Sequence, residues 1–113
     1  MKRYCLTVDL KNDPELIARY EAYHRDVWPE ILQSLTDSGI LSMQIYRLMT
    51  RMFMIIETSE DFSFERKSVM DAANLKVQEW EAIMGKFQQS LPGFDPEDPW
   101  KWKLMDKVFE FQG

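Results

Sequence analysis

The chain has 113 residues and a mass of 13.5 kDa, which is the usual size of one domain, so we expect a single domain over residues 1–113. Its 19 acidic side chains outnumber its 14 lysines and arginines, and a net charge of −5 disfavours nucleic acids and anionic membranes as partners. A single cysteine cannot form an internal disulfide, and a single histidine cannot build a histidine-rich metal site.

The sequence carries no sign of a membrane or secretory segment. Asp9 and Lys11 interrupt the first apolar residues too early for the apolar core of a secretory signal. The densest apolar run, 52–56, is far shorter than the roughly 20 residues that a membrane span needs. We therefore expect a cytoplasmic protein.

The first third of the chain predicts a strand and then an interrupted helix. Residues 3–10 alternate between apolar and polar side chains, as a half-buried strand does. The run Asn12-Asp13-Pro14-Glu15 supplies a capping residue, a proline tolerated in a first helical turn and a glutamate able to reach back to the cap. Pro29 falls inside the apolar stripe of this helix, so we expect a kink or brief break at 26–28, and Gly39 is a natural end of the second part.

The remaining elements complete an alternating order. Residues 41–48 and 52–58 predict a strand hairpin, while 62–73 and 75–89 have helical spacing with a joint at Asn74. Three prolines and a glycine predict a loop over 91–102, and residues 104–111 again resemble a strand. The predicted order is strand, helix, strand, strand, helix, strand.

This order is typical of the α+β ferredoxin-like fold (βαββαβ), an antiparallel sheet with its helices on one face. A chain of this length has no segment left to cover the other face, although the strand through 52–56 is apolar on both sides. We therefore expect two chains to pack sheet against sheet, as a homodimer with the form of a dimeric α+β barrel.

Few residues offer chemistry. Four scattered glycines cannot form a phosphate-binding loop, and no spacing of cysteine and histidine suggests a metal, so we expect no cofactor and no metal. Tyr20, His24 and Trp28 lie four residues apart and therefore share one helix face. An imidazole beside a phenol suits acid–base catalysis near neutral pH, although a buried structural histidine would give the same pattern.

The run from Tyr20 to Glu30, with Gly39, Ile45-Tyr46 and Gln78-Glu79-Trp80, resembles the L-rhamnose mutarotase family over nearly the whole chain. The resemblance implies that Tyr20 binds substrate, that His24 is catalytic and that Trp80 lines the pocket. Rhamnose enzymes of this family carry a second pocket tyrosine and a Trp-Trp pair where this chain has Met43 and Trp80-Glu81. The stretches 4–6, 62–67 and 77–81 look closer to the family's L-fucose mutarotases.

The resemblance implies a sugar mutarotase that interconverts the α and β anomers of a 6-deoxy-L-hexose, with L-fucose favoured and L-rhamnose as the alternative. The expected sugar-binding residues, besides the catalytic His24, are Tyr20, Trp28, Met43, Trp80 and Glu81. Glu81 is expected to accept a hydrogen bond from a hydroxyl whose orientation differs between the two sugars. A cofactor-free oxygenase or haem-degrading relative, and a non-enzymatic sugar-binding module, remain alternatives on the same dimeric fold.

Overall fold

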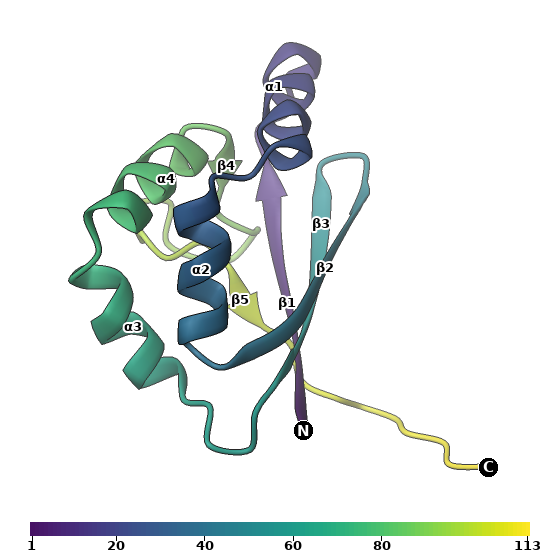
Figure 1. Cartoon of the computed structure of the whole chain (residues 1–113). Coiled ribbons are helices and arrows are strands. Elements are labelled where there is room, and N and C mark those ends of the chain that lie inside the picture. The colour runs from purple at the N-terminus through teal and green to yellow at the C-terminus, as the bar shows by residue number, and fades with distance from the viewer.

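A computed structural model describes the chain from Met1 to Gly113, and in it the helices gather on one face of an antiparallel sheet (Figure 1). None of the helices is both long and apolar enough to cross a membrane. The helices are α1 (Pro14–Arg25), α2 (Pro29–Asp37), α3 (Phe64–Ala72) and α4 (Leu75–Gly85). The strands are β1 (Lys2–Leu10), β2 (Ile40–Leu48), β3 (Arg51–Thr58), β4 (Gln88–Gln89) and β5 (Lys103–Leu104).

The sheet has the strand order β2-β3-β1-β4, and β5 pairs with a different stretch of the same β1 edge as β4. All pairings are antiparallel, with Leu6 opposite Met54 of β3 on one side and Leu104 of β5 on the other. This topology confirms the predicted α+β ferredoxin-like order, with β1 in the middle of the sheet.

The break in the first helical region is confirmed. The Asp13 carboxylate accepts hydrogen bonds from the backbone N–H groups of Glu15 and Leu16, which caps the start of α1. Residues 26–28 then leave the helix, and α2 begins at Pro29, whose ring fits a first helical position but not a helix interior. His24 therefore lies in the last turn of α1, next to a change of chain direction.

Glycine is required at the turn between α2 and β2. Gly39 has φ +97°, a conformation that L side chains rarely adopt, and a Cβ there would lie 2.8 Å from Ser59 Oγ. The Gly39 carbonyl also accepts a 2.9 Å hydrogen bond from the Ser59 N–H. The turn therefore holds the start of β2 against the end of β3.

The predicted helix over 75–89 is wrong beyond Gly85. The chain turns after α4, and Gln88 and Gln89 pair with Leu10 and Asp9 as strand β4. Phe87 continues the apolar spacing of α4 and is buried, so the helical pattern extends past the end of the helix itself.

The predicted last strand is also shorter than expected. Of the residues 104–111, only Leu104 belongs to a strand, the two-residue β5, and the Met105 N–H still bonds to the Cys5 carbonyl at 2.8 Å. The chain beyond this point runs away from the sheet (Figure 1) and leaves Val108, Phe109 and Phe111 largely exposed.

The two faces of the sheet differ in what covers them. The helical face holds the core, which consists of 14 buried residues that include Leu6, Val8, Leu10, Met52, Ile56 and Trp80. On the opposite face, Phe53 and Ile55 remain only half-buried and Tyr46 is exposed. The second face therefore presents apolar side chains without a cover from this chain.

Candidate active site

A cavity of about 430 Å³ lies between the sheet and the helices, within the usual size range of small-molecule sites. Its sheet side is apolar and is formed by Leu6, Met43, Ile45, Met54 and Ile56. Its other walls come from the four helices, β4 and the loop that carries Trp100 and Trp102. Of the six residues predicted to form the site, five line this cavity: Tyr20, His24, Met43, Trp80 and Glu81.

His24 lies half-buried in the cavity wall with its Nδ1 atom 3.0 Å from the backbone carbonyl oxygen of Tyr20. A carbonyl oxygen only accepts hydrogen bonds, so this contact places the ring hydrogen on Nδ1. The ring nitrogen Nε2 then has no partner within the protein. It is free to accept a proton from a bound molecule when the ring is neutral and to return it afterwards.

Tyr20 lies directly beneath this histidine, and its side chain is only 4% exposed. Burial disfavours the phenolate and raises the pKa of Tyr20 well above its ordinary value, an effect that the Gln88 side chain partly offsets. The nearby negative charge of Glu81 raises the pKa further. The hydroxyl therefore stays protonated at neutral pH and can serve as a hydrogen-bond donor in the cavity.

Two tryptophans stand side by side, and only one of them lines the cavity. The Trp80 ring meets the His24 ring edge-on at 5.6 Å between centroids and forms part of the cavity wall. Trp28 does not line the cavity but packs against the Trp80 ring at 5.2 Å, so it supports that wall from behind. Tyr23 has the same supporting role, with its ring edge-on to Trp80 at 6.0 Å.

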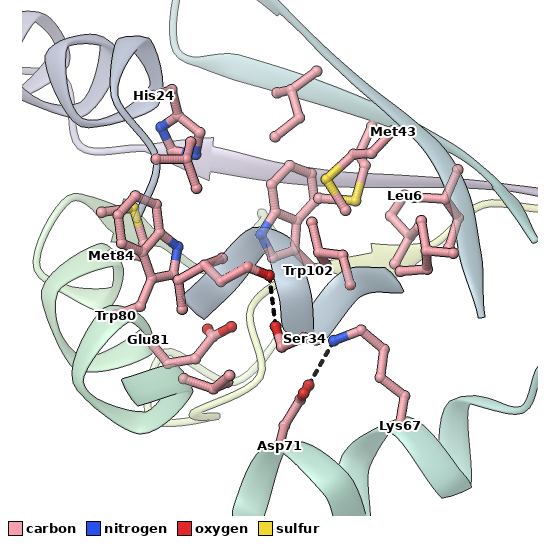
Figure 2. Close-up of a pocket in the computed structure, with 18 of the residues that line it drawn as sticks. Leu6, His24, Ser34, Met43, Lys67, Asp71, Trp80, Glu81, Met84 and Trp102 are labelled. Carbon is pink, nitrogen blue, oxygen red and sulfur yellow. Dashed lines mark hydrogen bonds and ion pairs between the residues drawn. The ribbon is translucent and has the colours of Figure 1, made fainter. Parts of the chain in front are cut away.

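Three charged side chains, Lys67, Asp71 and Glu81, lie in the cavity wall on α3 and α4 (Figure 2). Glu81 keeps access to solvent, but the protein around it disfavours the charged carboxylate and raises its pKa. The positive charge of Lys67 opposes this rise and the negative charge of Asp71 adds to it. Lys67 and Asp71 could not be recognised as site residues from the sequence, because charges four residues apart are typical of a solvated helix face.

The loop tryptophans take different positions. Both Trp100 and Trp102 line the cavity. Trp102 is buried in the core cluster, whereas Trp100 is half exposed. Gln88 is a further lining residue that the sequence analysis missed, because it was assigned to a helix rather than to β4. The loop therefore contributes two indoles to the cavity.

A second hollow of similar size lies beside the first and is more open. The two share Tyr20, His24 and Ile45, so the histidine lies between the main cavity and the outer hollow. An ion pair between Arg47 and Glu21, 2.9 Å from Nη2 to Oε1, borders this outer hollow. Solvent can therefore approach the histidine without passing through the main cavity.

A family profile and a curated relative both match nearly the whole chain. The sequence profile of the L-rhamnose mutarotase family matches residues 3–111. An L-fucose mutarotase from Xanthomonas campestris pv. campestris is 41% identical over 111 residues, which cover 96% of this chain and 87% of that protein.

Solved structures show the same fold at lower identity. A crystal structure of an L-rhamnose mutarotase from Formosa agariphila matches with a TM-score of 0.70 and 22% identity, covering 99% of this chain and all of that one. Tetracenomycin F2 cyclase from Streptomyces glaucescens, a type-II polyketide cyclase, matches with a TM-score of 0.62 and 16% identity over 100% and 99% of the two chains. A dimeric ferredoxin-like protein from an uncultured marine organism matches with a TM-score of 0.53 and 13% identity, covering 97% of this chain and 91% of that one.

Proposed function

This chain belongs to the L-rhamnose mutarotase family, whose members are carbohydrate isomerases, and from that premise we propose that it interconverts the anomers of L-fucose. The observation that carries the proposal is the pairing of His24 with Tyr20 in a cavity of sugar-binding size. The 41% identity to an L-fucose mutarotase supports L-fucose over L-rhamnose as the substrate.

His24 acts as the acid–base group in this proposal. Its Nε2 accepts the proton of the anomeric hydroxyl, and the bond from the anomeric carbon to the ring oxygen breaks as the aldehyde forms. The ring oxygen takes the proton back from Nε2 and becomes a hydroxyl. After rotation of the aldehyde, the same transfers in reverse close the ring on the other face.

Tyr20 serves as a hydrogen-bond donor to the oxygen that gains negative charge as the ring opens. Because burial keeps the hydroxyl protonated, it donates without losing its proton, and this stabilises the transition state more than the ground state. The Trp80 indole packs against the C–H face of the ring. Trp28 acts behind it, as a support for Trp80 rather than by contact with the sugar.

Glu81 sets the preference for L-fucose, whereas Met43 contacts a group that both sugars carry. L-Fucose and L-rhamnose differ in the orientation of ring hydroxyls, and the Glu81 carboxylate can accept a hydrogen bond from a hydroxyl that only one of them presents. Met43 lies on the sheet side of the cavity, where it leaves an apolar surface for the sugar's methyl group.

The enzyme is proposed to act as a homodimer in the cytoplasm. The half-buried Phe53 and Ile55 on the uncovered sheet face support packing against a second chain. Cys5 is a free thiol, which suits a reducing compartment.

Anomeric exchange measured by two-dimensional NMR on L-fucose and L-rhamnose tests the proposal. The wild-type protein should accelerate exchange of L-fucose more than that of L-rhamnose, and His24→Ala should lose on the order of 100-fold or more of this rate. Glu81→Trp should lower the fucose-to-rhamnose rate ratio by about tenfold. No acceleration on either sugar rejects the function, whereas an unchanged ratio in Glu81→Trp rejects only the role of that carboxylate.

A further inference from the structure

Lys67 and Asp71 form an ion pair inside the wall of the cavity, one helical turn apart on α3. The Lys67 Nζ atom lies 2.5 Å from Asp71 Oδ2, and the two side chains are only 20% and 19% exposed. Both residues line the same cavity as His24. The pair has no place in the proton transfers described above.

Helix stability does not explain a pair in this position. An exposed ion pair with this spacing contributes only a few tenths of a kcal/mol to a helix, and removing it from water costs more as it becomes buried. The other eight ion pairs of the chain, such as that of Lys76 with Glu79, lie outside the cavity. A charged pair that faces an otherwise largely apolar cavity therefore suggests a role toward a ligand.

The pair keeps hydrogen-bonding capacity that the protein does not use. The Lys67 ammonium donates to Asp71 alone, so two of its three hydrogens have no partner within the protein. The Asp71 carboxylate likewise accepts only from Lys67, which leaves its second oxygen, Oδ1, available. A donor and an acceptor held 2.5 Å apart match two neighbouring hydroxyls of a sugar ring, each of which can both donate and accept.

The pair also lies apart from the atom that moves protons. Lys67 and Asp71 extend from α3 on one side of the cavity, while His24 enters from α1 on the other (Figure 2). Glu81 of α4 lies near enough to both charges for them to shift its pKa in opposite directions. A ring with its anomeric carbon at His24 therefore presents its other hydroxyls to this charged side.

We propose that Lys67 and Asp71 bind two neighbouring hydroxyls of the monosaccharide on the side of the ring away from the anomeric carbon, and thereby help to select the sugar. This inference rests on the proposed function, because it takes a monosaccharide as the ligand of the cavity. The pair binds the ground state and the transition state alike. Its loss therefore raises KM and leaves kcat nearly unchanged.

The test measures KM and kcat for L-fucose anomer exchange in single and double variants. Asp71→Asn and Lys67→Met each remove one charge at nearly constant size, and each should raise KM on the order of 10- to 100-fold. Glu79→Gln is the matched control, because it makes the same change to an ion-paired carboxylate on α4 that does not line the cavity. It should leave KM unchanged.

A charge-swapped variant, Lys67→Asp/Asp71→Lys, separates recognition from a structural role. It keeps the attraction between the two positions, so the melting temperature should return to that of the wild type. Because donor and acceptor have exchanged places against the sugar, KM should stay raised. If a single variant does not fold, the KM of the swapped variant alone decides between recognition of the sugar and a structural role.

The outcomes distinguish the two proposals. If the wild-type protein accelerates exchange and the swapped variant regains the wild-type KM, the pair is structural and the inference is overturned. Single variants with an unchanged KM overturn it as well. If the wild-type protein accelerates exchange of neither sugar, the proposed function itself has failed.

Discussion

The His24 ring lies over the Tyr20 ring, with 4.4 Å between centroids and 34° between planes, while its Nδ1 is held 3.0 Å from the carbonyl of the same tyrosine. One residue thus fixes both the plane and the hydrogen position of the imidazole. The four-residue spacing on α1 makes both contacts possible, since residues i and i+4 are neighbours on a helix. The proton-transfer atom is thereby oriented by contacts within α1, and Trp80 of α4 adds an edge-on contact to the same ring.

Removal of the Tyr20 hydroxyl should slow the reaction while preserving the stack. In Tyr20→Phe the ring contacts with His24 and Phe87 remain, but the donor that stays protonated at neutral pH is lost. We expect the anomer exchange rate to fall roughly 10- to 100-fold. The NMR exchange assay on L-fucose measures this rate.

Tyr23→Phe is the matched control, because Tyr23 packs against Trp80 and Phe87 but does not line the cavity. It should keep the wild-type rate. Equal rates for both variants and the wild type would show that the Tyr20 hydroxyl has no part in catalysis.

Glu81 should destabilise the folded protein as the pH rises. Its pKa in the folded state is raised above the ordinary 4.5, so folding favours the protonated form. The stability linked to this proton is fully present below pH 4.5 and is lost as the pH rises through the higher folded-state pKa. The free energy of unfolding of Glu81→Gln, relative to that of the wild type, should therefore be greater at pH 7 than at pH 4.

Urea unfolding at the two pH values measures this difference, and Glu79→Gln, at an exposed position of the same helix that does not line the cavity, serves as the control. The control should show no such change between pH 4 and pH 7. If Glu81→Gln changes the free energy of unfolding equally at both pH values, the folded protein does not disfavour the charged carboxylate.

The uncovered sheet face should bind a second chain. Light scattering coupled to size-exclusion chromatography should give twice the 13.5 kDa mass of the chain. Ile55→Lys places a charge on that face and should yield monomers, because a lysine cannot be buried in an apolar interface without a partner. Leu75→Lys, at an 82% exposed position on α4, should leave the dimer intact. A monomeric wild-type protein would refute the prediction.

Gly39→Ala should destabilise the protein by about 2 kcal/mol, since the residue has φ +97° and the added methyl group would meet Ser59. Gly85→Ala is the contrasting variant, because a Cβ there meets nothing within 4 Å and alanine favours the helix by roughly 0.5 to 1 kcal/mol. Urea unfolding at neutral pH compares the two. Equal effects of the same sign would contradict the role assigned to Gly39.

The local signals in the sequence were sufficient for most of the fold. Pro29 predicted the break before α2, and Asn74 predicted the start of α4. The Asn74 side chain accepts hydrogen bonds from the backbone N–H groups of Lys76 and Val77 in the first turn of that helix. The end of α4 was missed because Phe87 continues the helical spacing while its burial comes from packing against α1. Pairing of Gln88 with Leu10 depends on a contact across most of the chain, which no local pattern encodes.

The candidate site was predictable to the extent that it depends on one helix. The shared face of Tyr20 and His24 follows from spacing, and the family resemblance added Trp80, Glu81 and Met43. Trp28 has the same spacing, but the break after Arg25 changes the chain direction and places its ring behind Trp80. The cavity side formed by α3 could not be anticipated, because its position against α4 is a matter of tertiary packing.

The concentration of indoles around the cavity has a practical consequence for spectroscopy. The chain has four tryptophans, of which Trp80, Trp100 and Trp102 line the cavity, while Trp28 touches the first of these. No tryptophan lies elsewhere to add a constant background. The intrinsic fluorescence of the unlabelled protein therefore originates almost wholly at the cavity, and its quenching or spectral shift gives an optical titration of occupancy that is independent of turnover.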